Sequence, residues 1–183
     1  MKLEMSLGGG ASRLAAIWEE FNTSDSLPDR ADFTLSRLGA LTSRFMALRA
    51  GEHGELVVVQ SGTAIDHIWG RNVVGASSGT MSLKFGANLS CEEALAALNQ
   101  PCGIHVSRTL EKSSGNKLKH ETLYLPVVSK RGRQLVSITD FAAARHMYGL
   151  LGDTTTIVNG EMHFSYFVDV GYGVPDVRDM RVA

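Results

Sequence analysis

The sequence has little of several features that mark specialised classes of protein. It contains two cysteines, Cys91 and Cys102, in 183 residues, which is too few for a disulfide-rich scaffold and favours a reducing compartment. No stretch approaches the roughly 18 consecutive apolar residues of a membrane span, and the first residues lack the apolar run of a signal peptide. We therefore expect a cytoplasmic protein without a membrane span.

Neither sign of charge is in excess. Lys and Arg number 18 and Asp and Glu number 19, so the net charge is −1. A nucleic-acid-binding surface needs a clear basic excess, so we expect no nucleic-acid partner. Hydrophobic residues make up 44% of the chain, enough to form one ordinary core.

Several short motifs that carry chemistry are also missing. The chain has no phosphate-binding glycine loop, and no Cys-x-x-Cys or His-x-x-x-His pair. Cys91, Cys102 and His105 lie near one another in sequence, but their spacing fits no closed metal site. We therefore expect no catalytic residues, no metal and no enzymatic activity.

An amphipathic helix is predicted near the N-terminus, after a flexible leader over residues 1–10. Its apolar side chains recur at i, i+3, i+4 and i+7: Leu14, Ile17, Trp18 and Phe21. Such a stripe packs either on the chain's own sheet or on a second subunit. We expect the latter, a homodimer with these four residues at a two-fold or partner contact. Residues 11–43 form the N-terminal helical segment, with a second helix from about Thr34.

Residues 44–140 have the pattern of a sheet interrupted by helices. Alternating strands are predicted over 44–49, 55–60, 104–110, 117–128 and 134–139. Gly62 and Gly70 bracket a short helix and are expected to take positive φ. A capping box from Ser90 to Glu93 opens another helix. Residues 141–183 are predicted as a helix over 141–151 and a strand over 161–170.

Four segments in this order resemble the PAS domain family, in the subtype found in short bacterial proteins. Gly-Thr-Ala-Ile-Asp-His-Ile-Trp-Gly-Arg-Asn-Val-Val-Gly over 62–75 is similar to its strand-to-helix segment. Leu-Tyr-Leu-Pro-Val-Val over 123–128, followed by the strand from Gln134, is similar to its closing hairpin. The Trp18 helix and the loop over 27–32 look like its leader. The resemblance covers residues 12–140 and implies an α+β fold, a five-stranded antiparallel sheet with helices on one face, cupped around a pocket.

The predicted ligand pocket lies between this sheet and the helices, with about half of its strand residues facing inward. We expect its lining from Leu56, Val58, Ile65, His67, Ile68, Trp69, Ile104, Val106, Leu123, Leu125, Val136 and Ile138.

The sequence does not identify a cofactor. A haem remains an alternative, since some PAS domains resemble haem sensors, with His67 and then His105 as candidate ligands. Light-sensing PAS relatives place a reactive cysteine directly after the asparagine of this segment, but Asn72 is followed by Val73. A covalent flavin adduct is therefore excluded, whereas non-covalent flavin stays open.

The resemblance implies a stand-alone sensory or regulatory domain that acts in signal transduction through a small ligand or a protein partner. The alternative is a small α+β enzyme or ligand carrier with a cone-shaped sheet. Such an enzyme would show a convergent acid–base set in its pocket, such as Asp with Tyr or His.

Overall fold

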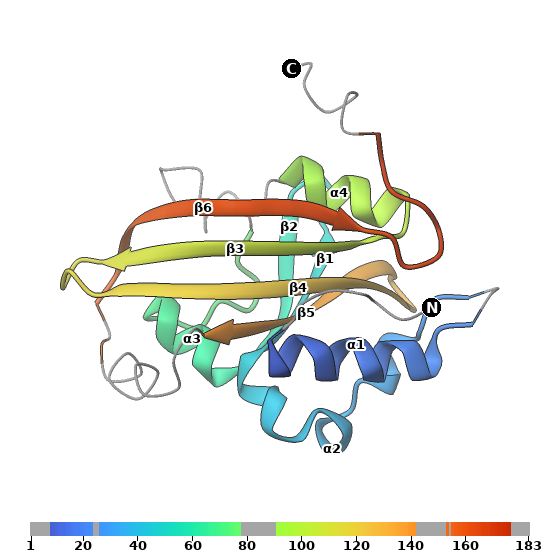
Figure 1. Ribbon diagram of the computed structural model, residues 1–183, viewed down its shortest axis with the longest axis horizontal. Helices are drawn as coiled ribbons and strands as arrows, with labels where there is room; N and C mark the ends of the chain where they lie inside the picture. Colours follow the sequence, from blue (N-terminus) through green and yellow to red (C-terminus); the bar gives the residue numbers. More distant parts are fainter. Residues whose placement is uncertain (1–7, 24–25, 78–90, 142–152, 154, 177–183) are drawn as a thin grey trace.

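The computed structural model describes residues 8–23, 26–77, 91–141, 153 and 155–176. The fold is α+β, with one antiparallel sheet in the strand order β2-β1-β5-β4-β3-β6 (Figure 1). The elements in chain order are α1 (Gly9–Phe21), η1 (Arg30–Asp32), α2 (Leu35–Leu38), η2 (Gly39–Arg44), β1 (Phe45–Ala50), β2 (Leu56–Ser61), α3 (Thr63–Trp69), α4 (Cys91–Asn99), β3 (Gly103–Lys112), β4 (Lys117–Ser129), β5 (Gly132–Phe141) and β6 (Ile157–Val168).

The five strands predicted between residues 44 and 140 are confirmed, and a sixth strand joins them. β6 pairs antiparallel with β3 from Gly103↔Val168 to Lys112↔Ile157. The C-terminal strand is therefore part of the same sheet rather than an extension outside it. The helix predicted over 141–151 falls almost wholly on residues 142–152, which lie outside the described residues.

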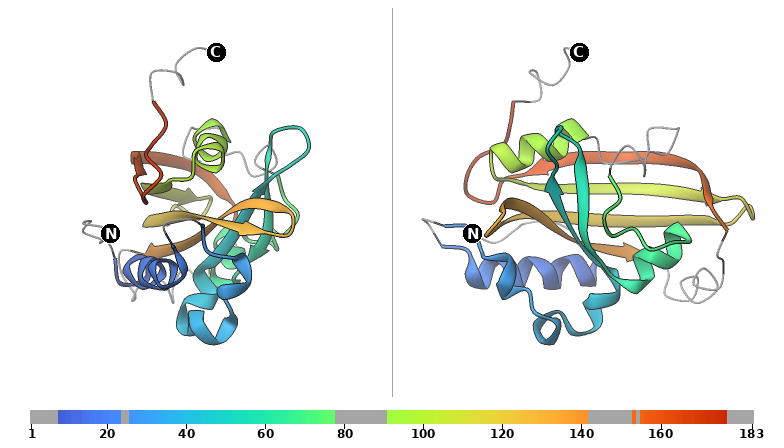
Figure 2. Two further views of the ribbon diagram at one scale, coloured as in Figure 1. Left: turned by 90° about the vertical axis from the view of Figure 1, so that its right-hand side faces the viewer. Right: turned by 180° about the vertical axis from the view of Figure 1, so that it is seen from behind.

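The sheet has helices on both faces because successive side chains of each strand alternate in direction. α3 and α4 pack on one face, which we call the inner face, against Val106, Tyr124 and Leu135. α1 and the segments after it pack on the outer face. They contact the strand side chains that alternate with those of the inner face, such as Leu123 and Leu125 on β4. Figure 2 shows α1 and α4 on opposite sides of the sheet. The core thus consists of two layers separated by β1, β5, β4 and β3.

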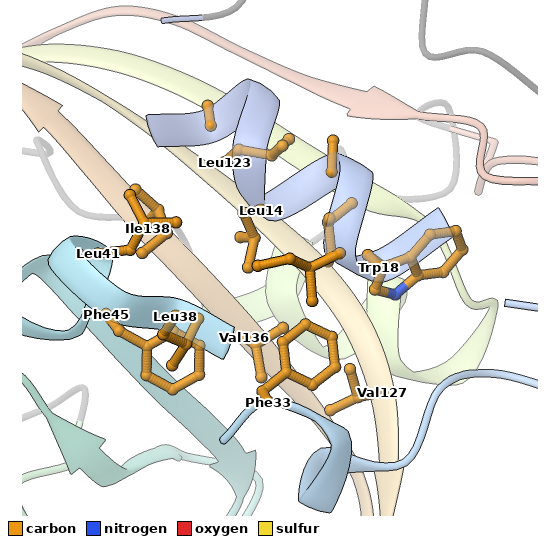
Figure 3. Packing of buried hydrophobic residues seen from close by; sticks show 14 of the residues in the cluster. Leu14, Trp18, Phe33, Leu38, Leu41, Phe45, Leu123, Val127, Val136 and Ile138 are labelled. Carbon is orange, nitrogen blue, oxygen red and sulfur yellow. The ribbon is translucent and has the colours of Figure 1, made fainter. Parts of the chain in front are cut away.

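Trp18 anchors α1 to the outer face. Its side chain is 1% exposed, and its indole Nε1 donates a hydrogen bond of 2.6 Å to the carbonyl oxygen of Pro126. Pro126 is paired with Leu135 of β5, but it lies beyond Tyr124, the last β4 residue paired with β3 toward that end. Because buried carbonyls need a donor, the indole completes the end of the β3–β4 ladder. Figure 3 shows Leu14 and Trp18 among the outer-face residues they contact, including Val127 and Val136.

The N-terminus of α1 is capped by a residue far away in sequence. α1 begins at Gly9, inside the segment predicted as a flexible leader, and has no side-chain cap of its own. The Asp140 carboxylate at the end of β5 accepts a hydrogen bond of 2.8 Å from the Ala11 amide and pairs with Arg44. A Cβ atom at Gly8 or Gly10 would overlap this carboxylate, so these glycines permit the close approach.

Gly70 and Gly62 bracket α3, but only Gly70 has the expected positive φ. Gly70 ends α3 with φ 65°, whereas Gly62 precedes it with φ −85°. Gly62 is needed for a different reason, because a Cβ there would overlap the backbone carbonyls of Thr42 and Ser43. The prediction of positive φ at Gly62 is therefore wrong.

Candidate functional site

A band of polar side chains crosses the middle of the inner face, between two apolar clusters. We call it the polar band and define it as Arg108 on β3, His120 and Thr122 on β4, and Ser137 and Thr139 on β5. These residues are 0–8% exposed. The pairings Arg108↔His120 and Thr122↔Thr139 place the side chains of each pair on the same face. Buried polar groups at such positions are unusual in a sheet core and mark a candidate site.

The centre of the band is an arginine–histidine pair. The Arg108 Nε atom donates a hydrogen bond of 2.7 Å to His120 Nε2. Because guanidinium can only donate, Nε2 accepts and the proton of the neutral imidazole is on Nδ1. Burial and then the positive charge of Arg108 hold the pKa of His120 well below its ordinary value, so the imidazole is neutral near pH 7.

The Nδ1 atom of His120 is a buried donor without a hydrogen-bond partner in the described part of the chain. The backbone carbonyl of Leu118 is close enough to oppose the lowering of the His120 pKa, but it does not meet hydrogen-bond geometry with Nδ1. Leaving such a donor unpaired costs about 1–3 kcal/mol. A partner that is not part of the described chain would remove that cost.

The other members of the band are hydroxyls. Thr122 and Thr139 share a buried hydrogen bond of 3.0 Å between their Oγ1 atoms, and Ser137 donates to the Met46 carbonyl. Apolar clusters lie on either side of the band along the strands. Ile68, Leu110 and Leu118 form one, and the larger cluster around Ile104, Val106 and Tyr124 forms the other.

The predicted pocket residues divide between the two faces of the sheet. Leu56, Val58, Ile65, Ile104 and Val106 belong to one inner cluster, with the half-buried Trp69 packed beside it, and Ile68 belongs to the second. Leu123, Leu125, Val136 and Ile138 lie on the outer face under α1. The register explains the split, because Ile104 is opposite Tyr124 and not Leu123 or Leu125. These four residues therefore do not share one pocket with the others.

The two candidate haem ligands are not brought together. His67 is on α3 but its side chain is exposed. His105 is buried on the outer face, where its Nδ1 atom lies 2.8 Å from the hydroxyl oxygen of Tyr166. Neither side chain lies in the inner-face core, so neither fits a haem held there.

A second polar group lies on the outer face, beyond α1, and sequence reasoning did not find it. His105 on β3 contacts Tyr166 on β6, and its Nε2 atom lies 3.4 Å from a carboxylate oxygen of Glu121 on β4. Burial lowers the pKa of His105, and Glu121 opposes this shift. Burial and the charge of Glu121 raise the pKa of Tyr166. The set is a neutral histidine, a protonated phenol and a carboxylate.

The cysteines do not approach each other as a metal set. Cys102 is buried in the inner cluster, and burial raises its pKa to about 12. The Cys91 thiol donates to the Gly54 carbonyl at 3.0 Å. Within the described ranges, no three His, Cys, Asp or Glu side chains converge in a way that would hold a metal ion.

The comparison with protein families decides the identity of the fold. The sequence matches the profile of the PAS domain over residues 9–139, which is more than half of the chain. The chain belongs to the PAS domain family. No curated protein and no solved structure gave a match. The family match ends before β6, so the sixth strand of this PAS domain lies outside the matched region.

The amphipathic stripe of this PAS domain is used internally. Leu14, Ile17 and Trp18 are at most 9% exposed and pack with β4 and β5, and Phe21 lies beside them. The expectation that this stripe forms a dimer or partner contact is therefore corrected, because the same atoms already bury the outer face. A homodimer stays a prediction and requires a different surface.

The polar band could have been sought in the alternation of β4. Leu118, His120, Thr122 and Tyr124 share one side of this strand and Leu123 and Leu125 share the other. Because Leu123 and Leu125 are the more hydrophobic of the two sets, an assignment by hydropathy places them, and not His120 or Thr122, in the pocket.

Within the part of the chain that the structure describes, no helix is long and apolar enough to cross a membrane.

Proposed function

We propose that this PAS domain is a non-enzymatic regulatory module in which a small ligand at the polar band controls how α1 is held on the outer face. The observation that carries the proposal is the unpaired Nδ1–H of His120 in a buried polar band. A PAS domain has a general sensory or regulatory role, and the finer assignment to ligand binding rests on this band. The proposal retains a cytoplasmic location and a protein partner in signalling.

The arrangement of β5 supports a route from the band to α1. Thr139 faces inward and bonds to Thr122, while the next residue, Asp140, faces outward and holds the N-terminus of α1. Consecutive strand residues move together because one peptide unit joins them. A ligand that shifts Thr139 would therefore shift the Asp140 carboxylate relative to Ala11 and Arg44. A protein partner would respond to the altered position of α1.

The test is nuclear magnetic resonance of the full chain with small-molecule cocktails that include neutral, anionic and cationic members. We expect at least one cocktail to shift the backbone amide signals of residues 106–110, 120–124 and 137–141, and also those of α1. Thr139→Val keeps the side-chain shape and removes the hydroxyl, so it should weaken the response. Thr109→Val is the matched control, since Thr109 is on the outer face and bonds to His163.

Two results would contradict the proposal. In the first, no cocktail perturbs the band. In the second, ligands shift the band while α1 is unchanged, which would disprove the coupling through β5.

One observation favours the alternative of an α+β enzyme. Glu121, His105 and Tyr166 form a convergent acid–base set, which is the feature expected of that alternative. The directions of the pKa shifts work against it, because a phenol whose pKa is raised is a poor base and His105 has few exposed atoms. We therefore keep regulation as the proposed function.

A further inference from the structure

Two aromatic side chains lie on the outer face of β6 without belonging to the hydrophobic core. The ring centroids of Phe164 and Tyr166 are 5.4 Å apart, and neither residue is a member of a core cluster. The cluster under α1 takes its strand residues mainly from β1, β4 and β5, whereas β6 is at the edge of the sheet (Figure 1). Because Tyr166 is 44% exposed, part of this aromatic pair faces solvent.

His105 fixes the position of both rings from below. Its imidazole makes edge contacts with Phe164 and Tyr166 at centroid distances of 5.1 and 5.4 Å. The tautomer follows from its two polar contacts. A lone pair on Nε2 would face the Glu121 carboxylate oxygen 3.4 Å away, so Nε2 carries the proton and Nδ1 accepts from the Tyr166 hydroxyl at 2.8 Å. The rings are therefore held in place before any partner binds.

The Glu121 carboxylate lies beside the two rings. Ser107 is between Glu121 and Phe164 in the strand register, and this small residue is only 1% exposed, so its longer neighbours close over it. Burial and the charge of Glu121 raise the pKa of Tyr166, which also indicates a short separation. The Glu121 side chain is 37% exposed, so its carboxylate is open to solvent on one side.

This carboxylate has no positively charged partner among the residues that the structure describes. Its ion-pair contact there is the one with the neutral His105. Asp140, opposite Glu121 on β5, has the same sign of charge and pairs with Arg44. Lys119 precedes Glu121 by two residues on the same face, opposite Thr109, and makes no described ion pair with it. The negative charge beside the rings is therefore free to attract a cation.

Two ring faces and a carboxylate together favour a guanidinium group. A guanidinium is planar, so it can stack on aromatic rings while it donates two parallel hydrogen bonds to a carboxylate. A lysine ammonium is more strongly hydrated and lacks the planar shape. The open position indicates where the guanidinium comes from. Small ligands are usually enclosed in a concave site, whereas arginine and aromatic residues meet on the surfaces of interacting proteins.

We propose that Phe164, Tyr166 and Glu121 form a docking surface for an arginine side chain of a partner protein. The guanidinium stacks on the two rings and donates to the Glu121 carboxylate, and His105 acts as a positioning residue beneath them. The inference goes beyond the proposed function, because it needs no ligand at the polar band. It gives the protein partner a stated chemistry, a surface segment with an accessible arginine.

Nuclear magnetic resonance of the full chain with matched peptides tests this. The probes are acetyl-Gly-Gly-Arg-Gly-Gly-amide and the same peptide with citrulline or lysine in place of arginine. Citrulline has nearly the shape of arginine but no charge. At equal concentration, we expect the arginine peptide to shift the ring signals of Phe164 and Tyr166 at least about threefold more than either other peptide. The δ-methylene protons of the arginine should move upfield, because they lie over ring faces.

Three variants locate the binding. Glu121→Gln keeps the side-chain shape and removes the charge, so it should abolish the preference for arginine over citrulline. Phe164→Leu keeps an apolar side chain and should reduce the upfield shift of the arginine protons. Glu111→Gln is the matched control, because Glu111 is on the same face of β3 but pairs with Lys117 and Asn159 rather than with an aromatic residue. This control should keep the preference.

Several outcomes would overturn the proposal, and the peptide comparison on the unmodified chain does not depend on the folding of any variant. Equal shifts from the arginine and citrulline peptides would show that the rings offer apolar contact alone. Equal shifts from the lysine peptide would contradict the assignment to guanidinium. A preference lost in Glu111→Gln would attribute binding to the general charge of the face. No shift of either ring would disprove the docking surface. The cocktail experiment on the polar band and α1 judges the proposed function separately.

Discussion

At the scale of single residues, Trp18 links packing to hydrogen bonding. Trp18→Phe keeps an aromatic ring but leaves the Pro126 carbonyl without its buried donor. We expect a folded protein whose free energy of unfolding falls by about 1–3 kcal/mol, measured by urea denaturation. Sedimentation should give the same oligomeric state as the unmodified chain, because the residue is internal. Leu35→Ala, at an exposed position, is the control. Dissociation of an oligomer without loss of stability would contradict this view.

The buried histidines predict a pH dependence with a definite sign. The pKa values of His105 and His120 are lowered in the folded state from an ordinary value of 6.5. As the pH falls below about 6.5, these histidines bind protons in the unfolded chain but stay neutral in the folded chain. The contribution of the two neutral imidazoles to the free energy of unfolding is therefore full above this pH and declines below it. Glu121 opposes the effect at His105, and Arg108 reinforces it at His120.

Urea denaturation at pH 8, 7, 6 and 5.5 measures this decline. Each histidine contributes at most about 1.4 kcal/mol per pH unit. His120→Phe should reduce the slope, with His53→Gln in the exposed β1–β2 turn as control. A stability that is constant from pH 7 to 5.5 would show that the two imidazoles are not buried as described.

At the scale of elements, α1 depends on a cap supplied by β5. Asp140→Asn keeps an oxygen acceptor but removes the negative charge that pairs with Arg44 and with the positive end of the helix dipole. We expect a loss of about 1 kcal/mol in stability and faster hydrogen exchange of the α1 amides. Glu20→Gln also neutralises a carboxylate paired with an arginine, but that pair is exposed, so its effect should stay within about 0.5 kcal/mol. Equal exchange rates in the two variants would refute the role of Asp140.

β6 protects the edge of β3. A chain that ends at Phe141 would leave the β3 edge unpaired and uncover residues that pack near Val168 and Phe167. Open edges of this length promote association. We expect this shorter chain to unfold at lower urea concentration and to elute as aggregates in size-exclusion chromatography. A monomer with an unchanged midpoint would mean that β6 is dispensable.

At the scale of the whole molecule, the regulatory proposal predicts no turnover. Ester, phosphoester and nucleotide substrates should be hydrolysed no faster by the protein than in buffer, because the described residues include no activated nucleophile beside His105. His105→Ala and Tyr166→Phe test the outer-face set directly. A rate above background that both variants abolish would reverse the assignment in favour of the enzyme alternative.

Much of the order of elements was predictable, because it depends on local patterns. The alternation over 104–110, 117–128 and 134–139 predicted β3, β4 and β5 to within a few residues. The i, i+3, i+4, i+7 spacing of Leu14, Ile17, Trp18 and Phe21 predicted α1. These signals are short-range, so they are present in the sequence itself.

The candidate site was much less predictable. Arg108 and His120 are adjacent only through the β3–β4 register, and Thr122 and Thr139 only through the β4–β5 register. Each residue alone resembles an ordinary polar strand position. Because Leu123 and Leu125 are hydrophobic, they were predicted to line the pocket, but they lie under α1 on the outer face.

By itself, then, the sequence determined the family, the five core strands and the amphipathic character of α1, because each follows from spacing along the chain. Only the tertiary structure decided which side of β4 faces inward. It also decided that the apolar side of α1 packs on its own sheet rather than on a partner. It also decided that Asp140 caps α1 and that β6 completes the sheet beside β3. The physical reason is that a one-residue difference in register exchanges the two faces of a strand, and nothing local to the strand sets that register.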